Sequence, residues 1–219
     1  MTISKKELAN YIDHSLLKPH LTTEEIISGC QLAKELACAT VCVNPTSITL
    51  AKEILAGSST KICSVVGFPS GAHTSYMKAK ETEEAYKLGA TEIDMVIHSG
   101  ALKSKQYTQV ERDIAAVVQA SPAIVKVILE MCYLTEEEKA IGCKLTEAAG
   151  AHYVKTSTGF APGGATLADI QLMKKSVSNH VKIKAAGGIR TLDFALQLIE
   201  AGSDRIGVSS TKDMIAELD

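Results

Sequence analysis

Short runs of apolar and β-branched residues recur along the chain, and longer segments with helical periodicity separate them. Such short runs are typical of buried strands, whereas apolar positions repeating every three or four residues are typical of amphipathic helices. The runs predict eight strands, at Tyr11–His14, Thr40–Asn44, Lys61–Val66, Glu92–Ile97, Val125–Glu130, Tyr153–Thr156, Lys182–Ala185 and Arg205–Val208. The helical pattern is clearest at Glu24–Leu36, Tyr76–Leu88, Glu136–Ala149 and Thr191–Ala201.

Glycine marks the end of several predicted helices in the same way. Gly89, Gly150 and Gly202 each stand between the last helical residues and the next predicted strand. Glycine adopts the left-handed backbone conformation that commonly closes a helix, so each position predicts a helix-to-strand turn.

The spacing of the strands indicates how they are connected. Successive strands begin roughly 20 to 33 residues apart, the length of one strand–helix unit. Eight units without a linker predict a single domain over residues 1–219, a (β/α)8 TIM barrel with a short N-terminal helix. The alternative is an open doubly wound sheet, which usually has a glycine-rich turn after its first strand. Residues 15–19 read SLLKP and contain no such turn.

Composition excludes several classes of protein. Of the 219 residues, 46% are hydrophobic but only 4% are aromatic, so the core is built mainly from aliphatic side chains. The formal net charge of −2 argues against binding nucleic acid through bulk charge. Residues 1–10 lack the apolar core of a signal peptide, and no apolar run is long enough to span a membrane.

The cysteines and histidines point to a reduced protein without a metal. The six cysteines form no CxxC pair, and the six histidines show no HxxxH or HExxH spacing. We therefore expect free thiols, a cytoplasmic location and no bound metal. The oligomeric state is left open by the sequence, which is compatible with a homodimer.

Three predicted strands carry a lysine among apolar residues. Lys126, Lys155 and Lys184 follow one another at intervals of 29 residues, which predicts comparable heights on neighbouring strands. A single such lysine would more often point outward with its ammonium group in water. Three in register favour a shared interior site, in which clustered cations and burial would make one of them neutral and nucleophilic.

Acidic residues on predicted strands could accompany these lysines. Asp94 lies in the otherwise apolar segment Glu92–Val96, and a closed barrel has no edge strand where it could simply face water. Asp94 would hold the remaining ammonium charge and move protons. Asp13 and Glu130 are further acids that could join the same network.

Two late loops have the composition of a phosphate site. Gly187 and Gly188 follow the seventh predicted strand, and Ser209 and Ser210 follow the eighth. In TIM barrels these two loops often bind phosphate through backbone N–H groups. Either loop alone would more often be an ordinary turn, but their joint occurrence indicates a phosphorylated ligand.

Motifs along nearly the whole chain resemble the deoxyribose-phosphate aldolase family of class I aldolases. They are Tyr11–His14, Val41–Pro45, Val65–Pro69, Gly89–Val96, Lys184–Arg190, Arg205–Gly207 and, most specifically, the KTSTGF segment at Lys155–Phe160. The chain differs from the family pattern at His98, where many members carry Asn, and at Thr211, where Gly is usual.

The resemblance implies a lyase that reversibly cleaves 2-deoxy-D-ribose 5-phosphate to acetaldehyde and D-glyceraldehyde 3-phosphate. It implies that Lys155 forms the Schiff base and that Asp94 and Lys184 transfer protons. The expected substrate- and phosphate-binding residues are Gly187, Gly188, Ser209, Ser210, Thr156 and Lys126. The partners would be phosphosugar and aldehyde substrates, with no cofactor, nucleic acid or membrane.

Two alternatives remain open at this point. One is another phosphosugar-acting barrel enzyme that uses the lysines only as electrostatic clamps. The other is a non-catalytic phosphosugar-binding protein, which would keep the phosphate loops but would be expected to lose the reactive lysine.

Overall fold

The strands close into a parallel barrel in chain order. In the computed structural model, which describes residues 3–218, β1 pairs with both β2 and β8. The strands are β1 Ile12–Leu16, β2 Thr40–Val43, β3 Lys61–Val66, β4 Glu92–Val96, β5 Ile124–Ile128, β6 Tyr153–Lys155, β7 Lys182–Ala186 and β8 Arg205–Val208. The predicted (β/α)8 barrel is therefore confirmed. Met1, Thr2 and Asp219, which belong to the expected domain 1–219, lie outside the described residues.

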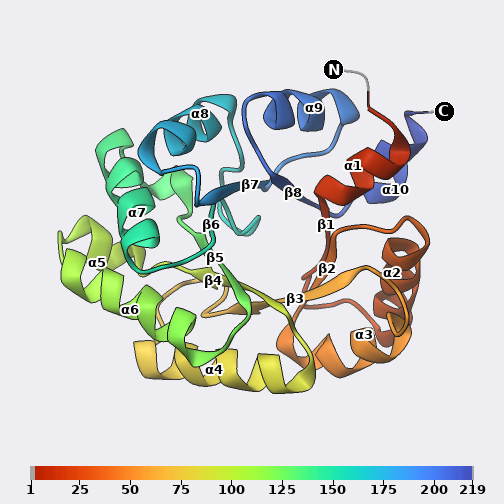
Figure 1. Ribbon diagram of the computed structural model, residues 1–219, viewed down its shortest axis with the longest axis horizontal. Coiled ribbons are helices and arrows are strands. Elements are labelled where there is room, and N and C mark those ends of the chain that lie inside the picture. The colour runs from red at the N-terminus through yellow and green to blue at the C-terminus, as the bar shows by residue number, and fades with distance from the viewer. Residues whose placement is uncertain (1–2, 219) are drawn as a thin grey trace.

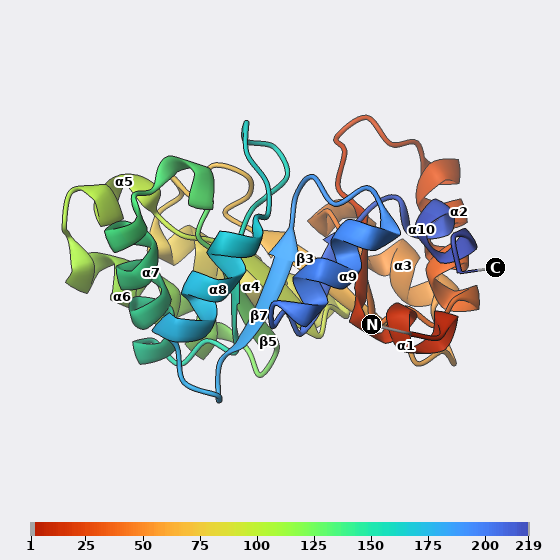
Figure 2. The ribbon, with the colours of Figure 1, turned by 90° about the horizontal axis from the view of Figure 1, so that it is seen from above.

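Helices surround the barrel and alternate with the strands (Figure 1). They are α1 Lys5–Tyr11, α2 Thr23–Glu35, α3 Ile48–Ile54, α4 Ser75–Leu88, α5 Ser99–Lys103, α6 Tyr107–Ala120, α7 Glu136–Ala148, α8 Leu167–Ser176, α9 Leu192–Glu200 and α10 Thr211–Ala216, with short 3-10 turns η1 Pro45–Ser47 and η2 Met131–Tyr133. The predicted N-terminal helix is α1, which lies beside α10, so the two ends of the described chain are close in Figures 1 and 2.

Local sequence signals set the helix ends. Ser4, Thr22 and Thr135 each accept the N–H of the third helical residue, a Glu whose carboxylate accepts the N–H of the capping residue in return. At the other end, Gly89, Gly150 and Gly202 have φ values of +124°, +79° and +115°. The predicted glycine caps are thus confirmed, and each helix turns directly into the next strand.

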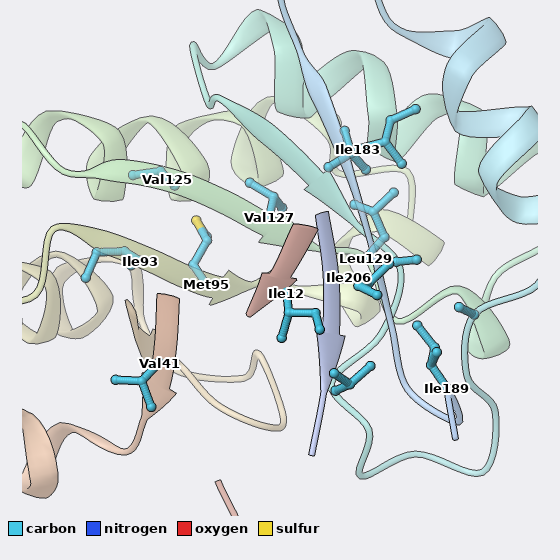
Figure 3. Close-up of a cluster of buried hydrophobic side chains, with 14 of the residues drawn as sticks. Ile12, Val41, Ile93, Met95, Val125, Val127, Leu129, Ile183, Ile189 and Ile206 are labelled. Atoms are coloured by element: carbon cyan, nitrogen blue, oxygen red, sulfur yellow. The ribbon is translucent and has the colours of Figure 1, made fainter. Parts of the chain in front are cut away.

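The apolar core lies mainly between the strands and the helices. Figure 3 shows this cluster, in which Ile93, Met95, Val125 and Val127 come from alternate positions of β4 and β5. Successive strand residues point to opposite faces, so the residues between them, Asp94 and Lys126, project into the barrel. The pleat therefore separates an aliphatic outer layer from a polar interior.

Most strands differ from the prediction by one or two residues at one end or both, and two differences in ends and register bear on the site. β5 ends at Ile128, so Glu130 is not a strand residue. Lys155 does lie opposite Lys184, but Lys126 lies opposite Tyr153, and Ile128 occupies the position opposite Lys155. The expectation that the three lysines share one height is therefore wrong for Lys126, which lies lower along its strand.

The helices also bear on membrane insertion. Within residues 3–218, none combines the length and the apolar character that crossing a membrane requires.

Candidate active site

One carboxylate in the barrel interior joins the three strand lysines. Oδ2 of Asp94 lies 2.6 Å from Nζ of Lys155 and 2.7 Å from Nζ of Lys184, and its Oδ1 lies 2.9 Å from Nζ of Lys126. Asp94, Lys126 and Lys184 are fully buried, and Lys155 is 2% exposed. The predicted grouping of the three lysines around Asp94 is present, although the lysines stand at different heights.

Further charges lie below this group, toward the beginnings of the strands. Asp13 of β1 forms an ion pair with Lys184, with 2.5 Å between Oδ2 and Nζ, and accepts a hydrogen bond from Arg205 of β8. Glu92 forms an ion pair with Lys126 at 2.7 Å. Asp13 thus belongs to the predicted network. Glu130 does not pair with these lysines, and its carboxylate instead accepts from Thr158.

Mutual contact keeps most of these groups ionised. Burial opposes the charge of Asp94, but the three ammonium groups outweigh it and hold its pKa well below the ordinary value. Burial would likewise lower the pKa of Lys184, yet Asp13 and Asp94 raise it above its ordinary value. Burial also acts to lower the pKa of Lys126, but nearby anions, Asp94 above all, raise it well above its ordinary value.

The interior network carries one more cation than it has carboxylates. Its cationic groups are Lys126, Lys155, Lys184 and Arg205, and its carboxylates are Asp13, Glu92 and Asp94. Loss of one proton would balance the charges in a site of low dielectric. Of the three lysines, Lys155 is the one that lines the open cleft, so its amine is the one that a ligand can reach.

A cleft of about 660 Å³ opens at the carboxyl ends of the strands and connects Lys155 to both predicted phosphate loops. It is lined by Gly187, Gly188, Ser209 and Ser210, as expected. TIM-barrel enzymes place their active sites at this end of the barrel. The cleft therefore offers one space for both a reacting carbon and a phosphate.

The backbone of the loop after β7 is open toward ligands. Gly187 and Gly188 have φ values of +87° and +74°, which favour glycine. A Cβ atom on Gly187 would lie 3.1 Å from Cα of Gly164, whereas one on Gly188 would meet nothing within 4 Å. Gly187 is thus required for close packing, and the backbone of Gly188 is left accessible.

Thr156 and Lys126 do not line this cleft. Oγ1 of Thr156 donates to the carbonyl of Ala186 and accepts its N–H, at 2.9 and 3.0 Å. Lys126 is enclosed by Asp94, Glu92 and the thiol of Cys63. The expectation that these two residues bind substrate conflicts with their placement, because both polar groups are buried and already paired with the protein.

Sequence reasoning missed the thiols and the cationic rim of the site. Cys42 and Cys63 occupy paired positions of β2 and β3, and their Sγ atoms lie within 4.8 Å of each other and of an Asp94 oxygen. Such donors can bind a metal, although the surrounding ammonium groups oppose a cation there. Lys18 and Arg190 line the cleft. Neither feature could be recognised in the linear sequence, because each depends on which strands and loops lie side by side in the fold.

The two departures from the family pattern have structural roles. His98 caps α5, since its Nδ1 accepts the N–H of Ala101 at 3.1 Å. Asn is among the best residues at such a cap, so His and Asn can do the same work there. Thr211 is fully buried, and its Oγ1 lies 2.8 Å from Nδ1 of His14, which ties α10 to β1.

Comparison with known proteins agrees with this geometry. A deoxyribose-phosphate aldolase from Brevibacillus brevis is 56% identical over 201 residues, which cover 91% of each chain. One from Streptococcus sanguinis is 54% identical over 205 residues, 93% of each chain. Among solved structures, a deoxyribose phosphate aldolase from Aeropyrum pernix, described as a tetramer, matches with a TM-score of 0.90 and 30% identity, covering 98% of this chain and 92% of its own.

The family assignment rests on almost the entire chain. The description "DeoC/LacD family aldolase" matches residues 7–216, which include every strand of the barrel and the whole Asp94 network. The chain therefore belongs to the DeoC/LacD family of aldolases.

Proposed function

We propose that the chain is a class I deoxyribose-phosphate aldolase that reversibly cleaves 2-deoxy-D-ribose 5-phosphate to acetaldehyde and D-glyceraldehyde 3-phosphate. The observation that carries the proposal is that Lys155 and Lys184 share Oδ2 of Asp94 while Lys155 lines the cleft. The family assignment and the names of the relatives support it.

Lys155 is the nucleophile in this reaction. Its neutral amine attacks the C1 carbonyl of the open sugar, and loss of water from the carbinolamine gives a protonated imine. Electrons of the C2–C3 bond then move to the imine nitrogen as the C3 hydroxyl loses its proton. This step yields an enamine on Lys155 and free glyceraldehyde 3-phosphate. Protonation at C2 and hydrolysis release acetaldehyde.

Asp94 and Lys184 move the protons. Asp94 touches the reacting nitrogen directly, at 2.6 Å, and Lys184 is hydrogen bonded to the same oxygen. A carboxylate and an ammonium group in contact can pass a proton to a leaving hydroxyl and recover it later. Lys184 remains cationic beside that amine, because Asp13 and Asp94 raise its pKa.

The phosphate lies at the loops after β7 and β8. The backbone of Gly188 is accessible, Ser209 is exposed, and Lys18 and Arg190 add positive charge at the rim. N–H groups, a hydroxyl and two cations suit a phosphate dianion. Lys126 and Thr156 support the site from below, by holding Asp94 and the loop after β7.

Six unpaired cysteines support a cytoplasmic location, since reducing compartments preserve free thiols.

Borohydride trapping tests the proposal. Acetaldehyde and borohydride together should attach an ethyl group to Lys155, seen by peptide mass spectrometry, and abolish cleavage of the sugar phosphate. A barrel enzyme that uses its lysines as clamps, or a protein that only binds phosphosugars, would form no adduct. An adduct confined to another lysine would overturn the role of Lys155, and Lys155→Met supplies the matched control.

A further inference from the structure

Glu130 has a backbone conformation that residues other than glycine rarely adopt. It follows β5 at the mouth of the barrel with φ +54° and ψ +64°, in the left-handed region. Its side chain is nevertheless buried, with the residue only 3% exposed. Strained conformations of this kind cluster at functional sites, where the surrounding structure holds them in place.

The carboxylate of Glu130 holds the segment that follows the Schiff-base strand. The N–H of Thr158 lies 3.3 Å from each carboxylate oxygen, and the hydroxyl of Thr158 donates to Oε2. That hydroxyl in turn accepts the N–H of Phe160 at 3.0 Å. One buried side chain thus fixes the backbone from Thr158 to Phe160. Burial raises the pKa of Glu130, and the hydrogen bonds from Thr158 and, to a smaller extent, the charge of Lys155 oppose this shift.

The residues held in this way form a wall of the cleft. Thr158 and Phe160 line both the Lys155 cleft and a neighbouring cavity of about 320 Å³, which Glu130 also lines. Phe160 packs edge-on against Phe68, with ring centroids 5.2 Å apart. The wall therefore depends on Glu130 from one side and on an aromatic contact from the other.

We propose that Glu130 is a positioning residue, whose carboxylate fixes Thr158 and Phe160 as the wall against which the sugar phosphate binds. Glu130 lines the neighbouring cavity and not the cleft that contains Lys155, so its contact with the cleft runs through Thr158. This inference rests on the proposed function, because it assigns a role within that same reaction.

Two variants separate the carboxylate from the turn. If Glu130 served only to make the turn, Glu130→Gly would be harmless or stabilising, since glycine adopts positive φ without strain. If the carboxylate is what matters, Glu130→Gly should raise the KM for deoxyribose 5-phosphate by about tenfold or more, as expected for loss of hydrogen bonds to a buried charge. Glu130→Gln, which keeps one acceptor oxygen, should give a smaller rise.

The rate of imine formation with acetaldehyde is the discriminating readout. Acetaldehyde is too small to need the wall, so borohydride trapping at Lys155 should stay within about twofold of the parent in Glu130→Gly. Glu137→Gln, an exposed change in the next turn of the chain, is the matched control and should alter neither quantity. Thermal melting checks that each variant is folded.

A double-mutant cycle keeps the proposal testable even if one variant folds poorly. Thr158→Val removes the hydroxyl that Glu130 accepts, and it should raise the same KM. Adding Glu130→Gly to Thr158→Val should then cost less than the sum of the two single changes, because both break the contact between the hydroxyl and the carboxylate, while Glu130→Gly also removes the acceptor of the Thr158 N–H. Additive effects, an unchanged KM in Glu130→Gly, or trapping that falls in step with KM would each overturn the positioning role. Failure of the parent itself to form the Lys155 adduct would instead refute the proposed function.

Discussion

Lys155 and Lys184 lie opposite each other on neighbouring strands, and their ammonium nitrogens approach the same oxygen of Asp94 at 2.6 and 2.7 Å. Two cations on one carboxylate oxygen leave a net positive charge between them. Lys155 alone of the pair lines the cleft, whereas Asp13 and Asp94 raise the pKa of Lys184 and keep it charged. The proposed division of roles, with Lys155 as nucleophile and Lys184 as proton-transfer group, rests on this difference in the surroundings of two chemically identical side chains.

Replacing Lys184 tests this division. Lys184→Leu removes a cation from Asp13 and Asp94, and single-turnover imine formation should slow by about 10²-fold or more through loss of the proton-transfer group. Removal of a neighbouring cation also favours protonation of Lys155, so the rate should rise at a higher pH than in the parent. Breaking a buried ion pair should lower the free energy of unfolding by about 3–5 kcal/mol.

Lys184→Arg provides the comparison for that measurement. Arginine keeps the charge but does not release its proton, so the pH profile should stay in place while the rate falls. A profile that Leu leaves unmoved would show that Lys184 does not tune Lys155 and serves only in proton transfer or binding.

A negative charge at the phosphate loops should weaken binding of the phosphorylated sugar. Ser209 is exposed in the cleft, so Ser209→Asp should fold normally and raise the KM for deoxyribose 5-phosphate by repelling its dianion. The KM for unphosphorylated deoxyribose should change far less, and Ser209→Ala gives the uncharged control. Equal effects on both sugars would mean that the loop supports the fold and does not bind the phosphate.

His14 should make the free energy of unfolding depend on pH in the mildly acidic range. Burial lowers its pKa to about 4, whereas an unfolded chain has a histidine pKa near 6.5. As the pH falls from about 6.5 to 4, the unfolded state takes up a proton that the folded state refuses, so the free energy of unfolding should drop by about 3 kcal/mol. His14→Gln should flatten this part of the curve.

The control for that experiment is His180, which is exposed. His180→Gln should keep the slope of the parent when unfolding by urea is measured at several pH values. A His14→Gln variant with the same slope as the parent would contradict the prediction.

Chelators should leave turnover unchanged. The donors that lie together are Cys42, Cys63 and Asp94, but the cations of Lys126, Lys155 and Lys184 surround them and oppose a metal. The proposed chemistry also uses only lysine and proton transfer. Loss of activity in EDTA, restored by a divalent ion, would overturn this expectation.

The alternation of strands and helices was readable from the sequence because each local signal is strong. Apolar runs, helical periodicity and the glycines at 89, 150 and 202 all agree on the same elements. Asp94 was identifiable because a closed barrel has no edge strand where an acid in an apolar segment could face water, so its burial indicates a partner or a function. Resemblance to a family then supplied the reaction, which the pattern alone could not name.

What the sequence could not provide was the register between strands. Lys126 and Lys184 are both 29 residues from Lys155, yet only Lys184 lies opposite it. Equal spacing along the chain does not fix equal height, because the loops and the η2 turn take up different lengths in each unit. The prediction that Glu130 lies on a strand was wrong because no glycine, proline or polar turn residue marks the end of β5 at Ile128.

The pairing of β1 with β8 has a consequence for how the enzyme becomes active. Asp13 comes from the first strand, and its partners Lys184 and Arg205 come from the last two. The charges around Asp94 are therefore complete only when the two ends of the chain have met. During synthesis the polypeptide should remain inert until β8 has left the ribosome and paired with β1. The time at which activity appears should therefore report when the barrel closes.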